Sequence, residues 1–344
     1  MMTSHPPRLL AVAMVFLLVL VACAGPAATP SPTGAPSPTA TPAAPTATPQ
    51  PTMAQPEISE LRVGVIPIVD VAPVHLAINE GLFAAEGLTV TAENMAGGAA
   101  AIPALQGGDL HIAFGAWPSF LVANQQGIEL RAVADGVSGR EGFTEFLALP
   151  DSGLEGNPAG MAGKTVALNT LGNVGELALR YALREAGVDY SQVTALEVPF
   201  PEMGAALDSG NVHVIWTPEP GVTGSKTNLG AVTVAPSYVG DMENFPVAGY
   251  FVTREFAEQN PNTVAAFVRA VEAASQMANE DSELLHEVVG TYTTLPPPLI
   301  AQLSYPEYHG ALEVATLQRV YDLLVEFEMI QEGLDVGSLV LTGN

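Results

Sequence analysis

The stretch Leu61–Ala92, LRVGVIPIVDVAPVHLAINEGLFAAEGLTVTA, contains one complete strand–helix–strand unit. Leu61–Pro67 is rich in β-branched residues and predicts a buried strand. Pro73–Glu86 predicts a helix, because proline is well tolerated in the first turn, where its missing N–H has no partner to lose. Leu88–Ala92 predicts a second strand. Two strands joined through a helix are typical of a mostly parallel sheet covered by helices.

The alternation of strands and helices continues along the rest of the chain. Further strands are predicted at residues 111–115, 129–134, 164–168, 193–198, 213–216 and 231–234. Further helices are predicted at residues 97–105, 117–126, 173–186, 202–208, 261–279, 282–291 and 309–330. The turn-rich residues 150–163 are predicted to form a crossing between two such series, so we predict an α/β fold with two lobes.

Two segments of fifteen residues, Ala104–Pro118 and Ala206–Pro220, align without gaps and share five identical residues. In both, a helix ends at glycine, a polar turn follows, and a short buried strand leads into a loop that contains proline. This similarity favours two related halves, although unrelated helix–strand units can share the pattern. His111 and His213 occupy matched positions at the starts of two predicted strands, and we expect a structural role for both.

The first 23 residues are typical of a secretory signal: Arg8 precedes an apolar run, Leu9–Ala22, that ends at Cys23. This run is too short to span a bilayer, which takes about 20 residues. The ending Leu-Val-Ala-Cys is similar to a bacterial lipobox, and Cys23 is the only cysteine of the chain. We therefore expect an extracytoplasmic protein, anchored to the cell membrane by lipid on Cys23. An ordinary signal peptide with an incidental cysteine is the alternative.

Residues 24–56 contain ten prolines and no charged side chain. Such a composition cannot bury enough apolar area to offset the entropy of ordering, and it predicts a disordered, extended stalk. We therefore divide the chain into residues 1–23 (signal), 24–56 (stalk), 57–148 (first part of lobe 1), 149–240 (lobe 2) and 241–344 (return to lobe 1, with C-terminal helices).

The chain carries 36 acidic and 11 basic residues, a formal net charge of −25. This charge argues against nucleic acid and anionic membrane surfaces as partners. The sequence contains no zinc-protease, phosphate-loop, dinucleotide-binding or nucleophile-elbow motif, and the folded part has no thiol. We therefore expect no metal, no cofactor and no catalysis.

Open α/β sheets bind ligands at the carboxyl ends of their strands, and here the loops at those ends come from both halves. The candidate ligand-binding residues are Asp70, Gly97, Gly98, Gly115, Trp117, Asp135, Asn169, Thr170, Asn173, Trp216, Glu219 and Tyr250. Tryptophan can stack on a flat ligand, carboxylates can accept ligand N–H or O–H groups, and a glycine-led helix start exposes backbone N–H groups. Core packing of the tryptophans and helix capping by the polar residues are the structural alternatives.

Several segments resemble the solute-binding proteins of ABC importers, specifically the NMT1/THI5-like group, which includes sulfonate, taurine and nitrate binders. The resemblance is carried by residues 72–90, 104–113, 127–134, 163–167, 183–189, 206–220 and 260–270. It implies a type II periplasmic-binding fold with two α/β lobes, a ligand cleft and two hinge crossings. It also implies a monomer that delivers a small-molecule solute to a separate membrane permease and its ATPase.

By position, the resemblance places Asp70, Gly98, Trp117, Asn173 and Glu219 on the ligand-contacting loops of the family. The family usually has aspartate where this chain has a histidine at the two matched strand starts.

No basic residue stands in the predicted cleft loops, which offer carboxylates, amides and tryptophan instead. This favours a flat, nitrogen-rich, neutral or weakly cationic solute, such as a thiamine-precursor pyrimidine or riboflavin. A sulfonate, taurine or nitrate-type anion is the alternative, since helix N-termini alone can hold an anion. A lipid-anchored enzyme or sensor on the same scaffold is a further alternative, because a fold does not determine a function.

Overall fold

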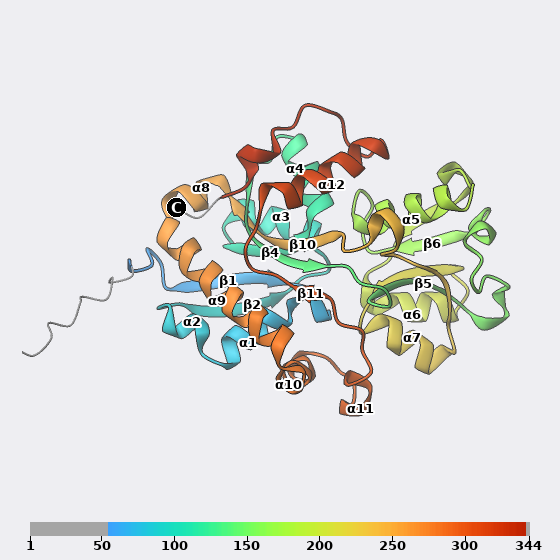
Figure 1. The fold of residues 1–344 in the computed structure, drawn as a ribbon, viewed down its shortest axis with the longest axis horizontal. Coiled ribbons are helices and arrows are strands. Elements are labelled where there is room, and N and C mark those ends of the chain that lie inside the picture. Colours follow the sequence, from blue (N-terminus) through green and yellow to red (C-terminus); the bar gives the residue numbers. More distant parts are fainter. Residues whose placement is uncertain (1–53, 342–344) are drawn as a thin grey trace, which may run out of the picture. The chain divides into compact units, whose positions relative to one another are not determined.

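The computed structural model describes residues 54–341, which form two β-sheets with helices on both faces (Figure 1). The predicted signal, Cys23 and nearly all of the predicted stalk lie outside the described residues. Within residues 54–341, no helix is both long enough and apolar enough to cross a membrane.

The sheet of lobe 1 has six strands in the order β11-β4-β10-β3-β1-β2. Strands β1 and β2 are parallel, as are β1 and β3, whereas β10 runs antiparallel between β3 and β4. The strands are β1 Glu60–Val65, β2 Thr89–Asn94, β3 Ile112–Ala116, β4 Leu130–Ser138, β10 Pro246–Thr253 and β11 Glu307–Tyr308.

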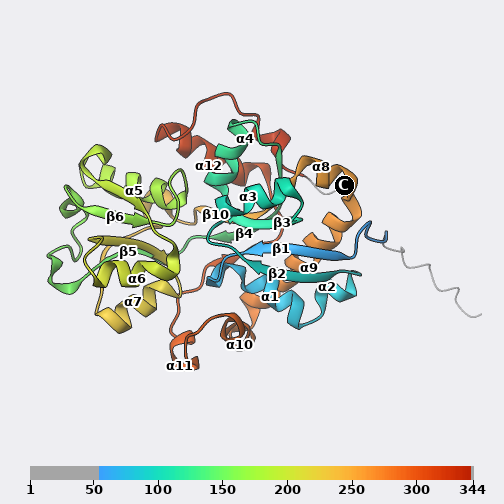
Figure 2. The same ribbon diagram turned by 180° about the vertical axis from the view of Figure 1, so that it is seen from behind.

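Helices cover both faces of this sheet: α4 and α12 lie on one side, and α1 and α9 lie on the other (Figures 1 and 2). The α-helices outside lobe 2 are α1 Ala72–Asn79, α2 Leu82–Ala85, α3 Gly98–Gly107, α4 Trp117–Gln125, α8 Arg254–Gln259, α9 Pro261–Glu280, α10 Ser282–Tyr292, α11 Pro297–Ile300 and α12 Val314–Glu326.

The sheet of lobe 2 has five strands in the order β7-β6-β8-β5-β9, and β5 runs antiparallel between β8 and β9. Its strands are β5 Thr144–Ala148, β6 Thr165–Leu168, β7 Thr194–Glu197, β8 Val214–Pro218 and β9 Val232–Pro236. Helix α5 (Val174–Glu185) lies on one face, and α6 (Phe200–Asp208) and α7 (Gly221–Leu229) lie on the other (Figure 2).

Short 3₁₀ helices occur in the connections between these elements. They are η1 Val69–Val71, η2 Pro150–Ser152, η3 Pro158–Met161, η4 Tyr190–Gln192, η5 Gly240–Met242 and η6 Val336–Leu339.

The two lobes repeat one strand order, β2-β1-β3-β10-β4 in lobe 1 and β7-β6-β8-β5-β9 in lobe 2. In each lobe the antiparallel strand arrives from the other lobe: β5 follows β4 along the chain, and β10 follows β9. The chain therefore crosses between lobes twice, at residues 139–143 and 237–245. The two-lobed α/β fold with two crossings confirms the predicted fold class.

Some predicted bounds need correction. The chain crosses before β5, so β5 belongs to lobe 2 although the predicted boundary placed residues up to 148 in lobe 1. The helix predicted over Pro73–Glu86 is divided into α1 and α2, because Gly81 has a left-handed backbone, φ 70°, that interrupts helical hydrogen bonding. The last predicted helix begins at Val314 rather than at 309, since a loop follows β11 first, and it ends at Glu326 rather than at 330.

His111 and His213 make the same reciprocal contact in the two lobes. The Nδ1 atom of His111 accepts a hydrogen bond from the backbone N–H of Arg62 (2.9 Å), and the backbone N–H of His111 donates to the Arg62 carbonyl (3.0 Å). The Nδ1 atom of His213 accepts from the N–H of Thr165 (3.1 Å), and its own N–H donates to the Thr165 carbonyl (2.9 Å). The structural role expected of both histidines is thus confirmed.

Candidate ligand-binding site

A small cavity of about 30 Å³ lies between the lobes, where strands of both sheets end. This volume holds roughly one or two water molecules. The cavity is lined by Ile66, Ile68, Asp70, Gly98, Phe114, Ala116, Phe143, Thr144, Asn169, Asn173, Val174, Phe200, Trp216, Pro218, Tyr238, Val247 and Ala248. Aromatic and aliphatic side chains therefore dominate the lining, with Asp70 as the single charged residue.

A larger cleft of about 830 Å³ adjoins this cavity, since Ile66, Ile68, Phe200 and Pro218 line both spaces. Its volume lies within the range of about 300–1,000 Å³ typical of small-molecule sites. Its other walls include residues 94–96 of lobe 1 and residues 199–205 of lobe 2. The cavity is thus the inner end of a cleft to which both lobes contribute.

Asp70 is held at the inner end by the 3₁₀ turn η1, and its side chain is buried. The carbonyl oxygens of Ile68 and Val69 accept hydrogen bonds from the hydroxyls of Tyr292 (3.2 Å) and Tyr308 (2.9 Å). The N–H of Val69 donates to the carbonyl of Glu219 in lobe 2 (3.3 Å). These three bonds fix the backbone immediately before Asp70.

The Oδ1 atom of Asp70 has no hydrogen-bond partner among the described residues. Burial raises the pKa of the Asp70 carboxyl to about 7, because the charged form is poorly solvated there. An unpaired buried polar atom costs about 1–3 kcal/mol, more when charged. A ligand that donates a hydrogen bond to Oδ1 would recover this free energy.

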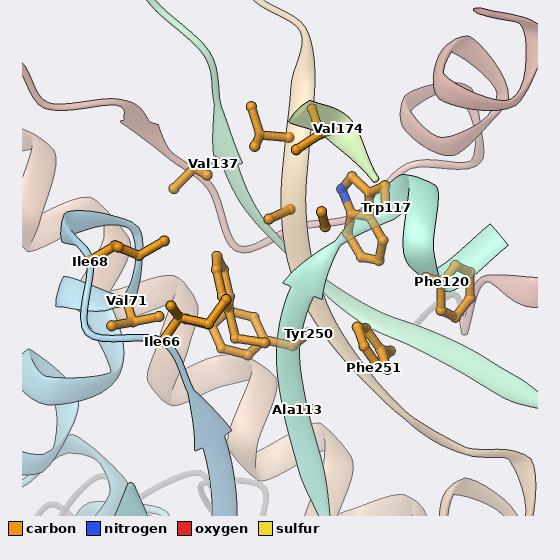
Figure 3. Close-up of a cluster of buried hydrophobic side chains, with 14 of the residues drawn as sticks. Ile66, Ile68, Val71, Ala113, Trp117, Phe120, Val137, Val174, Tyr250 and Phe251 are labelled. Atoms are coloured by element: carbon orange, nitrogen blue, oxygen red, sulfur yellow. The ribbon is translucent and has the colours of Figure 1, made fainter. Parts of the chain in front are cut away.

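Two buried tyrosine hydroxyls, those of Tyr238 and Tyr250, also lack hydrogen-bond partners among residues 54–341. Burial, and secondly the charge of Asp70, raises the pKa of both phenols above the ordinary value. Tyr238 follows β9 and lines the cavity, stacked on Phe143 with ring centroids 6.0 Å apart. Tyr250 lies on β10 in the lobe 1 core (Figure 3), where its ring meets those of Phe114 and Phe267 edge-on, and it is not part of the cavity lining.

The two tryptophans occupy different environments. Trp117 is completely buried in lobe 1, where its Nε1–H donates to Asp135 Oδ1 (3.3 Å) and its ring contacts Phe120 edge-on (Figure 3). It is not part of the cavity lining. Trp216 does line the cavity, with its Nε1–H directed to Ser237 Oγ (3.0 Å). Of the two tryptophans, only Trp216 therefore lines this space.

The other glycine and asparagine candidates lie close to the cavity. Gly98 lines it and packs on Gly115, where a Cβ on Gly98 would stand 2.4 Å from the Gly115 Cα. Across the lobes, a Cβ on Gly97 would lie 3.4 Å from the Asn169 side chain and 3.5 Å from the Thr170 hydroxyl. These three glycines allow α3 to lie directly on β3 and against lobe 2.

Asn169 and Asn173 line the cavity from lobe 2 and hydrogen-bond to each other (3.4 Å). Asn173 also caps α5, since its Oδ1 accepts from the N–H of Val174 (2.6 Å). Asn173 therefore both caps α5 and lines the cavity.

Two predicted carboxylates are already occupied. The carboxylate of Glu219 accepts hydrogen bonds from the N–H (2.9 Å) and hydroxyl (2.7 Å) of Thr223. The Oδ1 atom of Asp135 accepts from Trp117 and from the N–H of Gly136 (3.0 Å). Neither carboxylate lines the cavity. Within the described residues, no cluster of three or more histidine, cysteine, aspartate or glutamate side chains could hold a metal ion.

The sequence reasoning missed Phe143, Thr144, Phe200 and Tyr238, all of which line the cavity. Phe143 and Tyr238 lie in the two crossings between the lobes, and Thr144 begins the strand that follows the first crossing. The sequence placed the first crossing at residues 150–163, whereas the chain crosses at residues 139–143, so no local pattern marked these residues as neighbours. Tyr238 lies four residues after the predicted strand 231–234, and this position was the one available signal.

Comparison with known proteins agrees with this architecture. Residues 54–291 match the NMT1-like family. The riboflavin-binding protein RibY of Chloroflexus aurantiacus is 28% identical over 291 residues, covering 80% of this chain and 75% of that protein. The taurine-binding periplasmic protein of Escherichia coli is 27% identical over 214 residues, covering 61% of this chain and 64% of that protein.

Solved structures share the fold. The alkanesulfonate-binding protein SsuA of Xanthomonas axonopodis pv. citri, bound to MOPS, superposes with a TM-score of 0.71 at 18% identity, covering 83% of this chain and 99% of that one. The desulfurization enzyme DSZB superposes with a TM-score of 0.57 at 15% identity, covering 82% and 96%. At these identities the likeness concerns the fold alone. The match over most of the described residues confirms the resemblance drawn from the sequence, and the chain belongs to the NMT1-like family.

Proposed function

We propose that this protein is the extracytoplasmic solute-binding subunit of an ABC importer and captures a small organic solute between its two lobes. The observation that carries the proposal is the inner cavity, which both lobes line and which contains the unpaired, buried Asp70 Oδ1. The two relatives described above are named as binding proteins, for riboflavin and for taurine, and support a transport role.

Capture in this proposal proceeds by lobe closure. The lobes are joined by the two crossings, residues 139–143 and 237–245, which can act as a hinge. A ring system needs more room than about 30 Å³, so the lobes must separate to admit it. The closed complex would then dock on a membrane permease driven by an ATPase. We further propose that lipid on Cys23 anchors a monomeric protein, with residues 24–56 as the stalk.

For the solute we favour a flat, nitrogen-containing ring such as riboflavin or a thiamine-precursor pyrimidine. Phe143, Phe200, Trp216 and Tyr238 place aromatic rings around the cavity, which suits a planar partner. The relatedness to RibY supports this choice, whereas the taurine-binding relative supports the alternative of a sulfonate or similar anion.

An enzymatic role would need two carboxyl groups placed to act together as acid and base on a substrate, and the site does not have such a pair. An acid–base pair of Asp70 and Glu219 would have to face a substrate together, but the Glu219 carboxylate is engaged by Thr223. We therefore propose binding without catalysis, although an enzyme, DSZB, shares the fold. A sensor that passes the bound state to a membrane partner would use the same site.

The test is calorimetric titration of the purified protein with riboflavin, a thiamine-precursor pyrimidine, taurine, an alkanesulfonate and nitrate. Small-angle X-ray scattering with and without the solute that binds should show a smaller radius of gyration in the complex. Binding without compaction would argue against lobe closure. Binding of none of the five solutes would argue against the proposed function.

A further inference from the structure

We propose that Asp70, together with the hydroxyls of Tyr238 and Tyr250, forms a recognition centre that selects solutes bearing an N–H or cationic donor and rejects anions. This inference rests on the proposed function and names the solute class of that same site.

The first step concerns the unpaired atoms. Asp70 Oδ1, Tyr238 Oη and Tyr250 Oη are buried polar atoms without hydrogen-bond partners in the part of the chain that the structure describes. The side chains concerned are at most 3% exposed. Asp70 and Tyr238 line the cavity, whereas Tyr250 lies in the adjoining lobe 1 core. Because buried polar groups are nearly always hydrogen-bonded, these unpaired atoms indicate partners that the protein itself does not provide.

The second step concerns charge. Asp70 is the only charged residue in the cavity lining, and no lysine, arginine or histidine belongs to that lining. An ionised carboxylate can only accept hydrogen bonds, whereas a tyrosine hydroxyl can donate or accept. A solute with an N–H group or a positive charge satisfies the carboxylate, and the two hydroxyls can bond its neighbouring atoms. A sulfonate or nitrate at this point would face a like charge with no cation to offset it.

The third step concerns pre-organisation. The turn that carries Asp70 is bonded by Tyr292, Tyr308 and the Glu219 carbonyl, so the carboxylate cannot easily rotate away with its backbone. Lobe 2 meets it with Trp216 and with amides that are bonded to each other. The donor end of the solute therefore lies against lobe 1, and its apolar body lies against the aromatic rings.

The fourth step concerns size. The inner cavity opens into the cleft of about 830 Å³, which includes Asn94, Thr217 and Thr293 among its polar wall residues. A solute can therefore place a planar donor-bearing head at Asp70 and a larger polar part in the outer cleft. Riboflavin, with a ring imide N–H and a hydroxylated chain, has this form and serves as the main probe.

The experiment measures affinities of wild type, Asp70→Asn, Tyr250→Phe and a control, Asp135→Asn, by isothermal titration calorimetry. The probes are riboflavin, thiamine, an alkanesulfonate without an amino group, and nitrate. Asp135 is also a buried carboxylate of lobe 1, but it lies outside the cavity. A hydrogen bond to a charged group corresponds to roughly 10–100-fold in affinity, so Asp70→Asn should weaken a donor-bearing probe by that factor. Tyr250→Phe should weaken it about 3–10-fold, and Asp135→Asn should leave it within about threefold.

Circular dichroism first establishes that each variant is folded. Retained affinity in Asp70→Asn, or wild-type protein that binds the alkanesulfonate or nitrate and not the donor-bearing probes, would overturn the inference while leaving the solute-binding function intact. Folded wild-type protein that binds none of the probes would count against the proposed function and would overturn the inference with it.

Discussion

The two lobes share a framework but differ at the point where each meets the cavity. The loop after β1 in lobe 1 carries Asp70, whose Oδ1 is unpaired. The loop after β6, the equivalent strand of lobe 2, carries Asn169 and Asn173, whose amides bond to each other. The two amides of this lobe 2 loop are thus bonded to each other, whereas Asp70 Oδ1 in the lobe 1 loop has no partner. The comparison suggests that lobe 1 supplies polar recognition and lobe 2 supplies an aromatic cover.

The framework itself shows no such difference. His111 in lobe 1 and His213 in lobe 2 make the same pair of hydrogen bonds to the neighbouring strand. Both sheets also receive an antiparallel strand from the other lobe. Changes at the Asp70 turn should therefore be specific to lobe 1, while changes at the histidines should have equal effects in both lobes.

The largest expected effect is a stabilisation of the free protein by Asp70→Asn. The pKa of Asp70 is about 7 in the folded protein against 3.8 as the ordinary value. Below pH 3.8 the Asp70 carboxyl therefore does not lower the free energy of unfolding. Its destabilising effect grows as the pH rises from 3.8 to 7 and remains constant at higher pH. At 1.36 kcal/mol for each pKa unit, the variant should be up to about 4 kcal/mol more stable at pH 8 and about equal at pH 4.

Urea unfolding at the two pH values measures this difference, and the low-pH arm serves as the internal control. Equal unfolding free energies of variant and wild type at pH 8 would show that Asp70 is not held as a strained carboxylate. The proposed difference between the lobes, an unpaired carboxylate in lobe 1 and bonded amides in lobe 2, would then be contradicted.

The second effect is a pH-dependent affinity for riboflavin. Because the solute should bind the ionised form of Asp70, affinity should fall about 100-fold from pH 8 to pH 5 for a pKa near 7. The surrounding phenols of Tyr238, Tyr250, Tyr292 and Tyr308 have raised pKa values and stay neutral over this range.

Two neighbouring carboxyl groups have raised pKa values: burial raises the pKa of Asp135, on β4, to about 6, and burial also raises the pKa of Glu219 in lobe 2. Asp135→Asn should therefore leave in place the pH dependence that Asp70 causes. On α1, burial lowers the pKa of His75 to about 4, so its ring is also neutral between pH 5 and 8. Calorimetric titration at four pH values measures the profile, and Asp70→Asn should flatten it. If the affinity of Asp70→Asn for riboflavin changed with pH as steeply as that of the wild type, the pH dependence would come from another group.

The third effect compares the space around a helical glycine in lobe 1 with that around a helical glycine in lobe 2. Gly98→Ala should destabilise the protein by about 1–3 kcal/mol, because the new methyl group would overlap the backbone of Gly115 and push α3 away from β3. Gly204→Ala, in α6 of lobe 2, is the matched control: no atom lies within 4 Å of its Cβ position. That change should stabilise by up to about 1 kcal/mol. Thermal unfolding measures both stability changes. If Gly98→Ala stabilised the protein as Gly204→Ala should, the close approach of Gly98 to Gly115 would be contradicted.

The smallest effect concerns the histidine pair. His111→Ala and His213→Ala should each cost about 1 kcal/mol, since each removes one acceptor for a strand N–H. Replacement by aspartate, which restores an acceptor oxygen, should recover part of the loss. Urea unfolding measures the four variants. A loss at one position only would show that the duplicated framework is not energetically equivalent.

Much of the fold could be predicted because it depends on local pattern. The β-branched run at Leu61–Pro67 is close to β1, and the amphipathic helix predicted from Asn173 is close to α5, since hydrophobic periodicity directly reports which face is buried. The repeat between Ala104–Pro118 and Ala206–Pro220 likewise marks equivalent strands, β3 and β8. The assignment of β5 to lobe 1 was wrong. The lobe of β5 depends on its pairing with β8, which is distant in sequence, and a local pattern does not report that pairing.

The candidate site shows the same division. By itself the sequence determined that the chain has two α/β lobes, an acidic surface and polar loops after its strands, because these follow from composition and short-range periodicity. Only the tertiary structure decided that Trp117 packs in a core while Trp216 faces the cavity, and that Tyr238 joins Asp70 there. The reason is physical: the environment of a side chain depends on what the crossings and helices bring against it, and no local sequence pattern carries that information.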